Sequence, residues 1–142
     1  MKRIAAIALF VAATLLTAGR AVAQDHRVMA TVPFNFTVSD SSLPAGIYTI
    51  GFNSTAPNIL SILDGAKGIN ISALGMTYPR DPEKVAKLVF HRYGNQYFLS
   101  EIRFGSALMN VQFPATKLEM KARTQTQVAG LRVNDDVLVA LN

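Results

Sequence analysis

The sequence contains no cysteine and no tryptophan, and only 16% of its 142 residues are charged. The lack of cysteine excludes disulfide bonds, thiol redox chemistry and cysteine-based metal sites. A domain of this sequence must therefore be stabilised by its hydrophobic core instead of by disulfides. Half of the residues are apolar, which excludes a disordered polyelectrolyte and is sufficient for one folded domain.

Long apolar runs are scarce as well, and the most prominent one is the uncharged stretch at residues 4–18. A transmembrane helix needs about 20 apolar residues, so this run is too short to span a bilayer. It follows a short basic start and precedes Ala21-Val22-Ala23, the small-x-small pattern that signal peptidase recognises. We predict a cleaved signal peptide over residues 1–23 and a single β-rich domain over residues 24–142, with an uncleaved anchor as the alternative.

Positive charge exceeds negative charge in the whole chain, with 14 Lys+Arg against 9 Asp+Glu. Lys2, Arg3 and Arg20 belong to the predicted signal peptide, so the mature chain has 11 basic and 9 acidic residues. This small excess is spread singly along the chain and does not form a nucleic-acid footprint. We expect an exported protein, periplasmic or extracellular, with no nucleic-acid partner, no integral membrane span in the mature chain, and an unknown envelope or extracellular partner.

Alternation of apolar and polar residues predicts a mainly β fold. From residue 28 to residue 38 every second residue is apolar, as in one strand with a half-buried face. Pro33 lies within this segment and favours an edge position or a bulge. We predict further strands over residues 47–52, 59–63, 69–74 and 137–141, turns over residues 39–46 and 64–68, and loops over residues 53–58 and 78–82.

The strongest hairpin signal lies at residues 85–104, where Gly94-Asn95 favours a tight turn between two apolar-rich strands. The predicted pairs are Arg92 with Tyr97, His91 with Phe98, Phe90 with Leu99, and Leu88 with Glu101. This register places Phe90 and Leu99 on one face and Phe98, Ile102 and Phe104 on the other. Because both faces need cover, we expect the hairpin to be central, beneath a second layer or a helix.

Residues 116–126 fit either a helix or a strand. Thr116 and Glu119 match a capping box after Pro114, and good helix formers follow. The same segment also alternates between apolar and charged residues, as a strand does. We favour the helix, so the predicted fold is a single antiparallel β-sandwich or partly open β-barrel with one short C-terminal helix.

Three segments resemble one family of small exported bacterial proteins. They are Val32-Pro33-Phe34-Asn35-Phe36, Leu43-Pro44-Ala45-Gly46 with Tyr48, and residues 87–102, which read KLVFHRYGNQYFLSEI. The resemblance covers most of residues 28–120 and implies a single β-rich domain behind a signal peptide. It implies no activity and no catalytic residue.

Residues for metal, nucleotide or hydrolytic chemistry are few. His26 and His91 are the only histidines, and no spacing matches a zinc site or a phosphate-binding loop. Asp135-Asp136 is interpreted as a turn, because a calcium loop needs more oxygen ligands. His91 is the one candidate base for a hydrolase, but no G-x-S-x-G motif and no catalytic carboxylate pair is present. We predict no metal site, no cofactor and no catalytic residue, and favour a non-enzymatic protein.

Polar and aromatic side chains gather on the predicted hairpin and form the candidate ligand-binding cluster: His91, Arg92, Tyr93, Tyr97, Glu101 and Arg103. Such a mixture can make a ligand surface. It can equally stabilise the sheet through an Arg92–Tyr97 pair and an ion pair of Glu101, which is the favoured interpretation. As function we expect an exported non-enzymatic β-domain that acts in binding or envelope interaction. The alternatives are a carrier of small apolar ligands in a barrel cavity and a hydrolase that uses His91.

Overall fold

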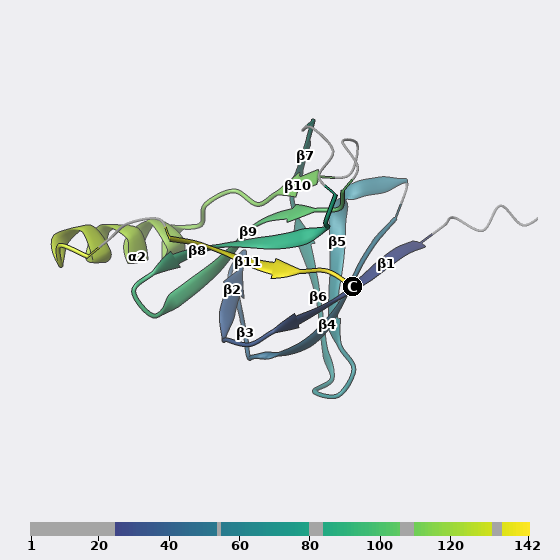
Figure 1. The fold of residues 1–142 in the computed structure, drawn as a ribbon, viewed down its shortest axis with the longest axis horizontal. Coiled ribbons are helices and arrows are strands. Elements are labelled where there is room, and N and C mark those ends of the chain that lie inside the picture. The colour runs from purple at the N-terminus through teal and green to yellow at the C-terminus, as the bar shows by residue number, and fades with distance from the viewer. Residues whose placement is uncertain (1–24, 54, 80–83, 106–109, 132–134) are drawn as a thin grey trace, which may run out of the picture.

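The protein is a β-sandwich in which two sheets pack face to face, with one helix near the C-terminal end of the described chain (Figure 1). The computed structural model describes residues 25–53, 55–79, 84–105, 110–131 and 135–142. The sheets do not close into a barrel, so the predicted sandwich with a short C-terminal helix is confirmed. The predicted signal peptide lies outside the described residues. The helix within the described ranges lacks the length and apolar character to cross a bilayer.

The described part of the chain consists mainly of strands. They are β1 (Asp25–Val32), β2 (Phe36–Val38), β3 (Ser41–Leu43), β4 (Gly46–Asn53), β5 (Ala56–Asp64), β6 (Ile69–Leu74), β7 (Met76–Tyr78), β8 (Lys87–Tyr93), β9 (Gln96–Arg103), β10 (Asn110–Gln112), α2 (Lys117–Val128) and β11 (Asp135–Ala140).

The first sheet has the strand order β1-β4-β5-β6, and each strand runs antiparallel to its neighbour. The two-residue period of a strand decides which side chains face the core. In β4, Tyr48, Ile50 and Phe52 are buried, whereas Ile47 on the opposite face is 56% exposed. The alternation that predicted β4, β5 and β6 is therefore confirmed.

The second sheet has the order β11-β8-β9-β10-β7, and β2 lies beside β9 with β3 beside β2. Its pairs are antiparallel except for one parallel contact between β2 and β9. Both sheets contribute to the core between them. Its largest fully buried side chains include Tyr48, Ile50, Leu60, Ile62, Leu88, Phe90 and Ile102.

The chain passes from the first sheet to the second at Pro33. The prediction of one continuous strand over residues 28–38 is wrong, because β1 ends at Val32 and β2 begins at Phe36. Proline has no backbone N–H to donate to a strand ladder, so pairing stops at this position. The apolar face is nevertheless continuous, since Val32 and Phe36 are both buried in the same core and Phe34 packs against it.

Two segments that we expected outside strands contain them. Ser41–Leu43, placed in a predicted turn, forms β3 and pairs with β2. β5 begins at Ala56, within residues 53–58 that were predicted as a loop. Both segments are ordered by backbone pairing with a neighbouring strand, which alternation of side chains does not reveal.

The central hairpin forms as predicted at its tip. β8 and β9 pair antiparallel around the turn at Gly94-Asn95, and Gly94 has a positive φ of 62°. The observed pairs near the turn are Arg92 with Tyr97, His91 with Phe98, and Phe90 with Leu99. The register that we derived from the Gly-Asn turn is therefore confirmed over this part of the hairpin.

Further from the tip, the predicted register is wrong. A bulge shifts the pairing between Val89 and Phe90, so Leu88 pairs with Ile102 and not with Glu101. An extra residue in one strand turns every later side chain of that strand to the other face. Ile102 consequently lies in the main core, and Phe104 packs against that core, instead of joining Phe98 on the opposite face.

The C-terminus joins the two sheets along one side. Leu141 bridges Ala30 of β1, and Met29 and Asn142 exchange backbone hydrogen bonds of 3.1 and 2.9 Å. The predicted last strand is confirmed as β11, but it begins at Asp135, so the interpretation of Asp135-Asp136 as a turn is wrong: both residues pair with β8. Its continuation to residue 142 covers part of the outer edge of β1.

A buried carboxylate holds two turns of the first sheet together. Asp64 is 3% exposed, and its Oδ1 accepts the backbone N–H groups of Ala66 and Lys67 at 3.0 and 3.2 Å. Lys67 Nζ donates to the carbonyl of Ala45 and lies 3.7 Å from Asp64 Oδ2. A Cβ on Gly46 would lie 2.7 Å from Asp64 Oδ2. A side chain at the last position of the Leu43–Gly46 turn would therefore displace the Asp64–Lys67 pair.

After its return to the first sheet at β4, the chain passes to the second sheet again at Gly75, which separates β6 from β7. The Gly75 N–H donates to the carbonyl of Asn58 at 2.8 Å. A Cβ at this position would lie 2.2 Å from Val111 Cγ1 and 3.1 Å from the carbonyl oxygen of Gln112. Only a residue without a side chain fits between β10 and the end of β5.

Gly75→Ala is expected to lower the free energy of unfolding by about 1–3 kcal/mol, because the added methyl group overpacks a site closed by the buried Val111 side chain and the Gln112 carbonyl. Gly65→Ala is the matched control, since nothing lies within 4 Å of a Cβ at Gly65. Urea unfolding of both variants measures the difference. Equal stability of the two variants would contradict the close approach at Gly75.

Candidate functional site

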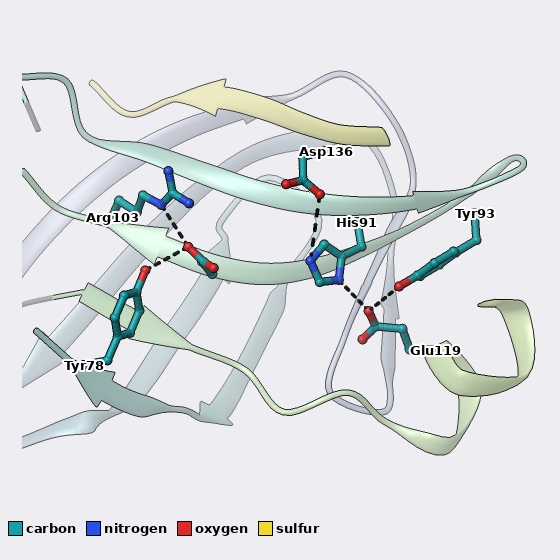
Figure 2. A network of polar contacts seen from close by, with 7 residues as sticks. Tyr78, His91, Tyr93, Arg103, Glu119 and Asp136 are labelled. Carbon is teal, nitrogen blue, oxygen red and sulfur yellow. Dashed lines mark hydrogen bonds and ion pairs between the residues drawn. The ribbon is translucent and has the colours of Figure 1, made fainter. Parts of the chain in front are cut away.

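The β8–β9 hairpin divides the six predicted ligand-binding residues between its two faces. His91 and Arg103 point to the outer face of the second sheet, where Tyr93 also reaches α2 (Figure 2), and Glu101 accepts a hydrogen bond from Arg103. Arg92 and Tyr97 lie on the other face, next to the main core. The predicted cluster is therefore not one site, because neighbouring residues of a strand point in opposite directions.

The outer face is organised around Glu119 of α2. Figure 2 shows His91 and Tyr93 of β8 directed at this carboxylate. His91 Nδ1 lies 2.8 Å from Glu119 Oε1, and the Tyr93 hydroxyl donates to the same oxygen at 3.2 Å. The other ring nitrogen of His91 lies 3.9 Å from Asp136 Oδ1 of β11. We name Glu119, His91 and Tyr93 the helix clasp, because they tie α2 to the sheet.

The role of Glu119 differs from the one its sequence position suggests. Thr116 caps α2 as predicted, since its hydroxyl accepts the Glu119 N–H at 3.3 Å. In a full capping box the glutamate side chain returns to the N-cap backbone. Here it binds His91 and Tyr93 instead, and the residue is only 6% exposed. No sequence signal connects residue 119 to residues 91 and 93, which lie more than 25 positions away.

A small apolar cluster completes the contact between α2 and the sheet. Ala122 packs against Tyr93 and Phe98, apart from the main core. Glu119, Ala122 and Thr126 are the buried residues of the helix and share one face at spacings of three and four. Because this cluster is small, the polar contacts of the clasp contribute a large part of the docking.

Electrostatics favours a charged histidine in the clasp. The hydrogen bond to Glu119 raises the pKa of His91 above its ordinary 6.5; partial burial opposes this, and the charges of Glu119, Asp136 and Glu101 add to it. Burial, followed by the nearby Glu119 carboxylate, raises the pKa of Tyr93 to about 12. Tyr93 therefore stays a neutral donor over the physiological range, and His91 is the group that titrates.

Glu101 and Arg103 belong to a second contact on the outer face. Glu101 Oε2 accepts from Arg103 Nε at 2.8 Å and from the Tyr78 hydroxyl at 2.8 Å. Tyr78 is the last residue of β7, so this carboxylate connects β9 to the edge of the second sheet. The ion pair expected for Glu101 is present.

On the other face, Arg92 and Tyr97 form a rigid stack at the tip of the hairpin. Tyr97 stacks on Phe34 with ring centroids 4.0 Å apart, and Phe34 meets the edge of Phe90 in the core at 5.1 Å. The Arg92 guanidinium lies 5.6 Å from the Tyr97 ring centroid, and Arg92 Nε donates to the Gly94 carbonyl at 2.9 Å. The expected Arg92–Tyr97 pair is present and fixes the turn to the core.

Two surface recesses flank this tip. The first, of about 150 Å³, is lined by Asn35, Phe36, Thr37, Ser42, Asn95, Gln96 and Tyr97. The second, of about 180 Å³, is lined by Arg92, Gly94, Leu131 and Asp135. We name the first the amide recess, because its polar lining consists of amide and hydroxyl groups without a charged side chain.

Most polar side chains of the amide recess make no hydrogen bond within the described parts of the chain. Asn35 Oδ1 accepts the Ala45 N–H at 2.9 Å, which fixes the orientation of this side chain. The side chains of Thr37, Ser42 and Gln96 hydrogen-bond to no other described residue. These groups are the ones that a polar ligand can bind without first breaking a protein contact.

Metal chemistry has no candidate in the part of the chain that the structure describes, since no group of three metal-ligating side chains comes together there. Comparison of the chain with protein-family models, curated proteins and solved structures finds no match. The resemblance to a family of small exported bacterial proteins therefore stays a prediction, and the candidate site rests on geometry.

The helix clasp makes stability depend on pH. A histidine whose pKa is higher in the folded chain contributes its stabilisation below the unfolded pKa and loses it as the pH rises through the folded pKa. We expect wild type to exceed His91→Gln by about 1–2 kcal/mol near pH 5, because a charge-assisted bond to Glu119 is lost in the variant. This advantage should decline towards about pH 9, where His91 is neutral.

Urea unfolding of both proteins at several pH values measures this difference. His26→Gln is the control, because His26 lies on β1 and stacks on Phe52, away from the clasp. That variant should keep the pH-dependent contribution of His91. A wild-type advantage that is constant between pH 5 and pH 9 would contradict the charged clasp.

Proposed function

We propose that this chain is an exported, non-enzymatic binding domain whose ligand surface is the amide recess at the tip of the β8–β9 hairpin. The observation that carries the proposal is the contrast between the two faces of the hairpin. On the outer face, His91, Tyr93 and Glu101 are engaged in contacts that hold the fold together. At the tip, the side chains of Thr37, Ser42 and Gln96 line a recess and hydrogen-bond to no other described residue.

The chemistry of the amide recess favours an uncharged ligand that is rich in hydroxyl groups, such as a segment of a saccharide chain. Amides and hydroxyls both donate and accept hydrogen bonds, as sugar hydroxyls do. An apolar ligand would leave these groups desolvated and unpaired, which is unfavourable. Pockets for drug-sized ligands measure about 300–1,000 Å³, so a recess of about 150 Å³ suits one unit of a longer chain.

The rigid tip supports binding. The Arg92–Tyr97–Phe34 stack and the Arg92–Gly94 hydrogen bond order the turn before a ligand arrives. A site that is already ordered loses less conformational entropy on binding. In this arrangement Arg92 and Tyr97 position the site, and Asn35, Thr37 and Gln96 form the hydrogen bonds with the ligand.

The environment of His91 supports a non-enzymatic role. One ring nitrogen lies against the Glu119 carboxylate and the other faces Asp136. A general base must be neutral and within reach of the proton that it removes, whereas these carboxylates raise the pKa of His91. No observation in the described parts of the chain favours the hydrolase or the apolar carrier over the binding domain.

Ligand binding is tested by thermal unfolding of the mature chain with neutral oligosaccharides, compared with anionic oligosaccharides and fatty acids. A ligand at 100 times its dissociation constant adds about 2.7 kcal/mol to the stability, which raises the melting temperature by several degrees. Gln96→Ala is expected to weaken the binding about two- to tenfold, as the loss of one neutral hydrogen bond does.

Gln112→Ala is the matched control, because Gln112 is an exposed glutamine on β10 and does not line the amide recess. It should bind as wild type does. Stabilisation by fatty acids alone would contradict the amide recess and support an apolar carrier. Hydrolysis of a saccharide that disappears in His91→Ala would contradict the non-enzymatic role.

Export is part of the proposal and has its own test. The apolar run at residues 4–18 and the Ala21-Val22-Ala23 pattern support cleavage after residue 23. Expression of the full chain in a bacterium should yield a soluble protein outside the inner membrane whose N-terminus is Gln24. Intact mass and N-terminal sequencing identify it, and a full-length protein retained in the membrane would indicate the uncleaved anchor.

A further inference from the structure

The outer strands among the described residues are β1, β3, β6, β7 and β11, and they differ in how their free edges are protected. Natural proteins blunt an edge strand by covering it, by shortening it or by placing charge on it, because unpaired backbone groups recruit other strands. β1 is covered in part by the C-terminus through Ala30 and Met29. β3 and β7 have only three residues each, and β11 begins with Asp135 and Asp136. Four edges thus carry a protective device.

The fifth edge, β6, carries none of these devices among the described residues. β6 has six residues, Ile69–Leu74, with the sequence INISAL, and contains neither a charge nor a proline. It pairs with β5 in continuous register without a bulge, and no other described strand pairs with it. Its backbone therefore presents a regular and uncharged edge.

The surface beside this edge is also uncharged and partly apolar. Leu74 is 63% exposed, and its cross-strand partner Ile59 on β5 is 49% exposed on the same outer face. Asn70 and Ser72 are the other exposed residues of β6. A strand that paired with β6 would shield Leu74 and Ile59 from solvent and would lie beside no charged residue of β6.

We infer that β6 is a self-association edge, at which two copies of this chain pair antiparallel to form one continuous eight-stranded sheet. Charge favours a second copy in this orientation. A two-fold axis brings the same strand against itself, and INISAL has no charged residue that would meet its own copy. The nearest charge that precedes β6, Lys67 in the hairpin, would lie beside the far end of the partner's β6, about 30 Å from its symmetry mate.

Such a pair would be modest in strength, because one edge strand buries less than a standard interface of about 1,600 Å². We therefore expect a reversible dimer that grows with protein concentration. The amide recess lies on the second sheet and on the β2–β3 segment, so dimerisation through β6 of the first sheet leaves both copies of the recess accessible. The inference does not depend on the ligand of that recess.

Sedimentation velocity of the mature chain over a range of concentrations tests the inference. Wild type should shift from the mass of one chain towards that of two. Ser72→Lys should weaken association at least about tenfold, because like charges then meet across the two-fold axis. Asn70→Lys, a second exposed position on β6, should act in the same way.

Thr31→Lys is the matched control, because Thr31 is exposed on β1 at the opposite edge of the same sheet. It should dimerise as wild type does, and circular dichroism should show that all three variants are folded. A mixture of Ser72→Lys and Ser72→Glu proteins should recover association, since the charges are then opposite. A chain that remains monomeric at all concentrations, or a Thr31→Lys variant that is equally impaired, would overturn the inference.

Discussion

Both faces of the β8–β9 hairpin are covered, and the rest of the structure depends on this constraint. The inner face supplies Leu88, Phe90 and Ile102 to the core between the sheets. The outer face supplies Phe98 to a second contact, which α2 covers through Ala122. A strand that is buried on both sides cannot carry solvated polar residues freely, so each polar group on it must find a partner. The polar residues of the hairpin therefore differ in whether they have a protein partner or face solvent.

On the outer face, carboxylates are the partners of the polar side chains of the hairpin. Glu119 is nearly fully buried, and a buried carboxylate is unfavourable unless it is paired and hydrogen-bonded. His91 and Tyr93 provide both contacts, and a protonated His91 also neutralises the charge. The same chemistry explains why an apparent catalytic histidine is better understood as a docking group for a helix. Glu101 has the equivalent position between Arg103 and Tyr78.

Polar side chains at the tip of the hairpin do not need a protein partner, because the tip extends to the end of the sandwich, where solvent reaches it. There the aromatic stack on Phe34 supplies rigidity, and the amides around it remain exposed to solvent. The proposed binding surface and the proposed dimer edge lie on different sheets. The second sheet would present the ligand site, and the first sheet would join two copies. In that arrangement one dimer offers two equivalent sites to a repetitive ligand, and linked sites raise the apparent affinity.

Local patterns in the sequence determined most of the secondary structure. Alternating apolar residues identified β1, β4, β5 and β6, the Gly94-Asn95 turn set the hairpin register near its tip, and Thr116 with Glu119 marked the start of α2. These signals are local, because the backbone period, the turn geometry and the first turn of a helix each involve only a few neighbouring residues. Tertiary structure decided the rest. The break at Pro33, the bulge beside Val89 and the short β3 depend on which strands become neighbours. The contact of His91 with Glu119, and the recess that Asn35, Asn95 and Gln96 line beside Tyr97, depend on distant segments, and only the packed sandwich brings these segments together.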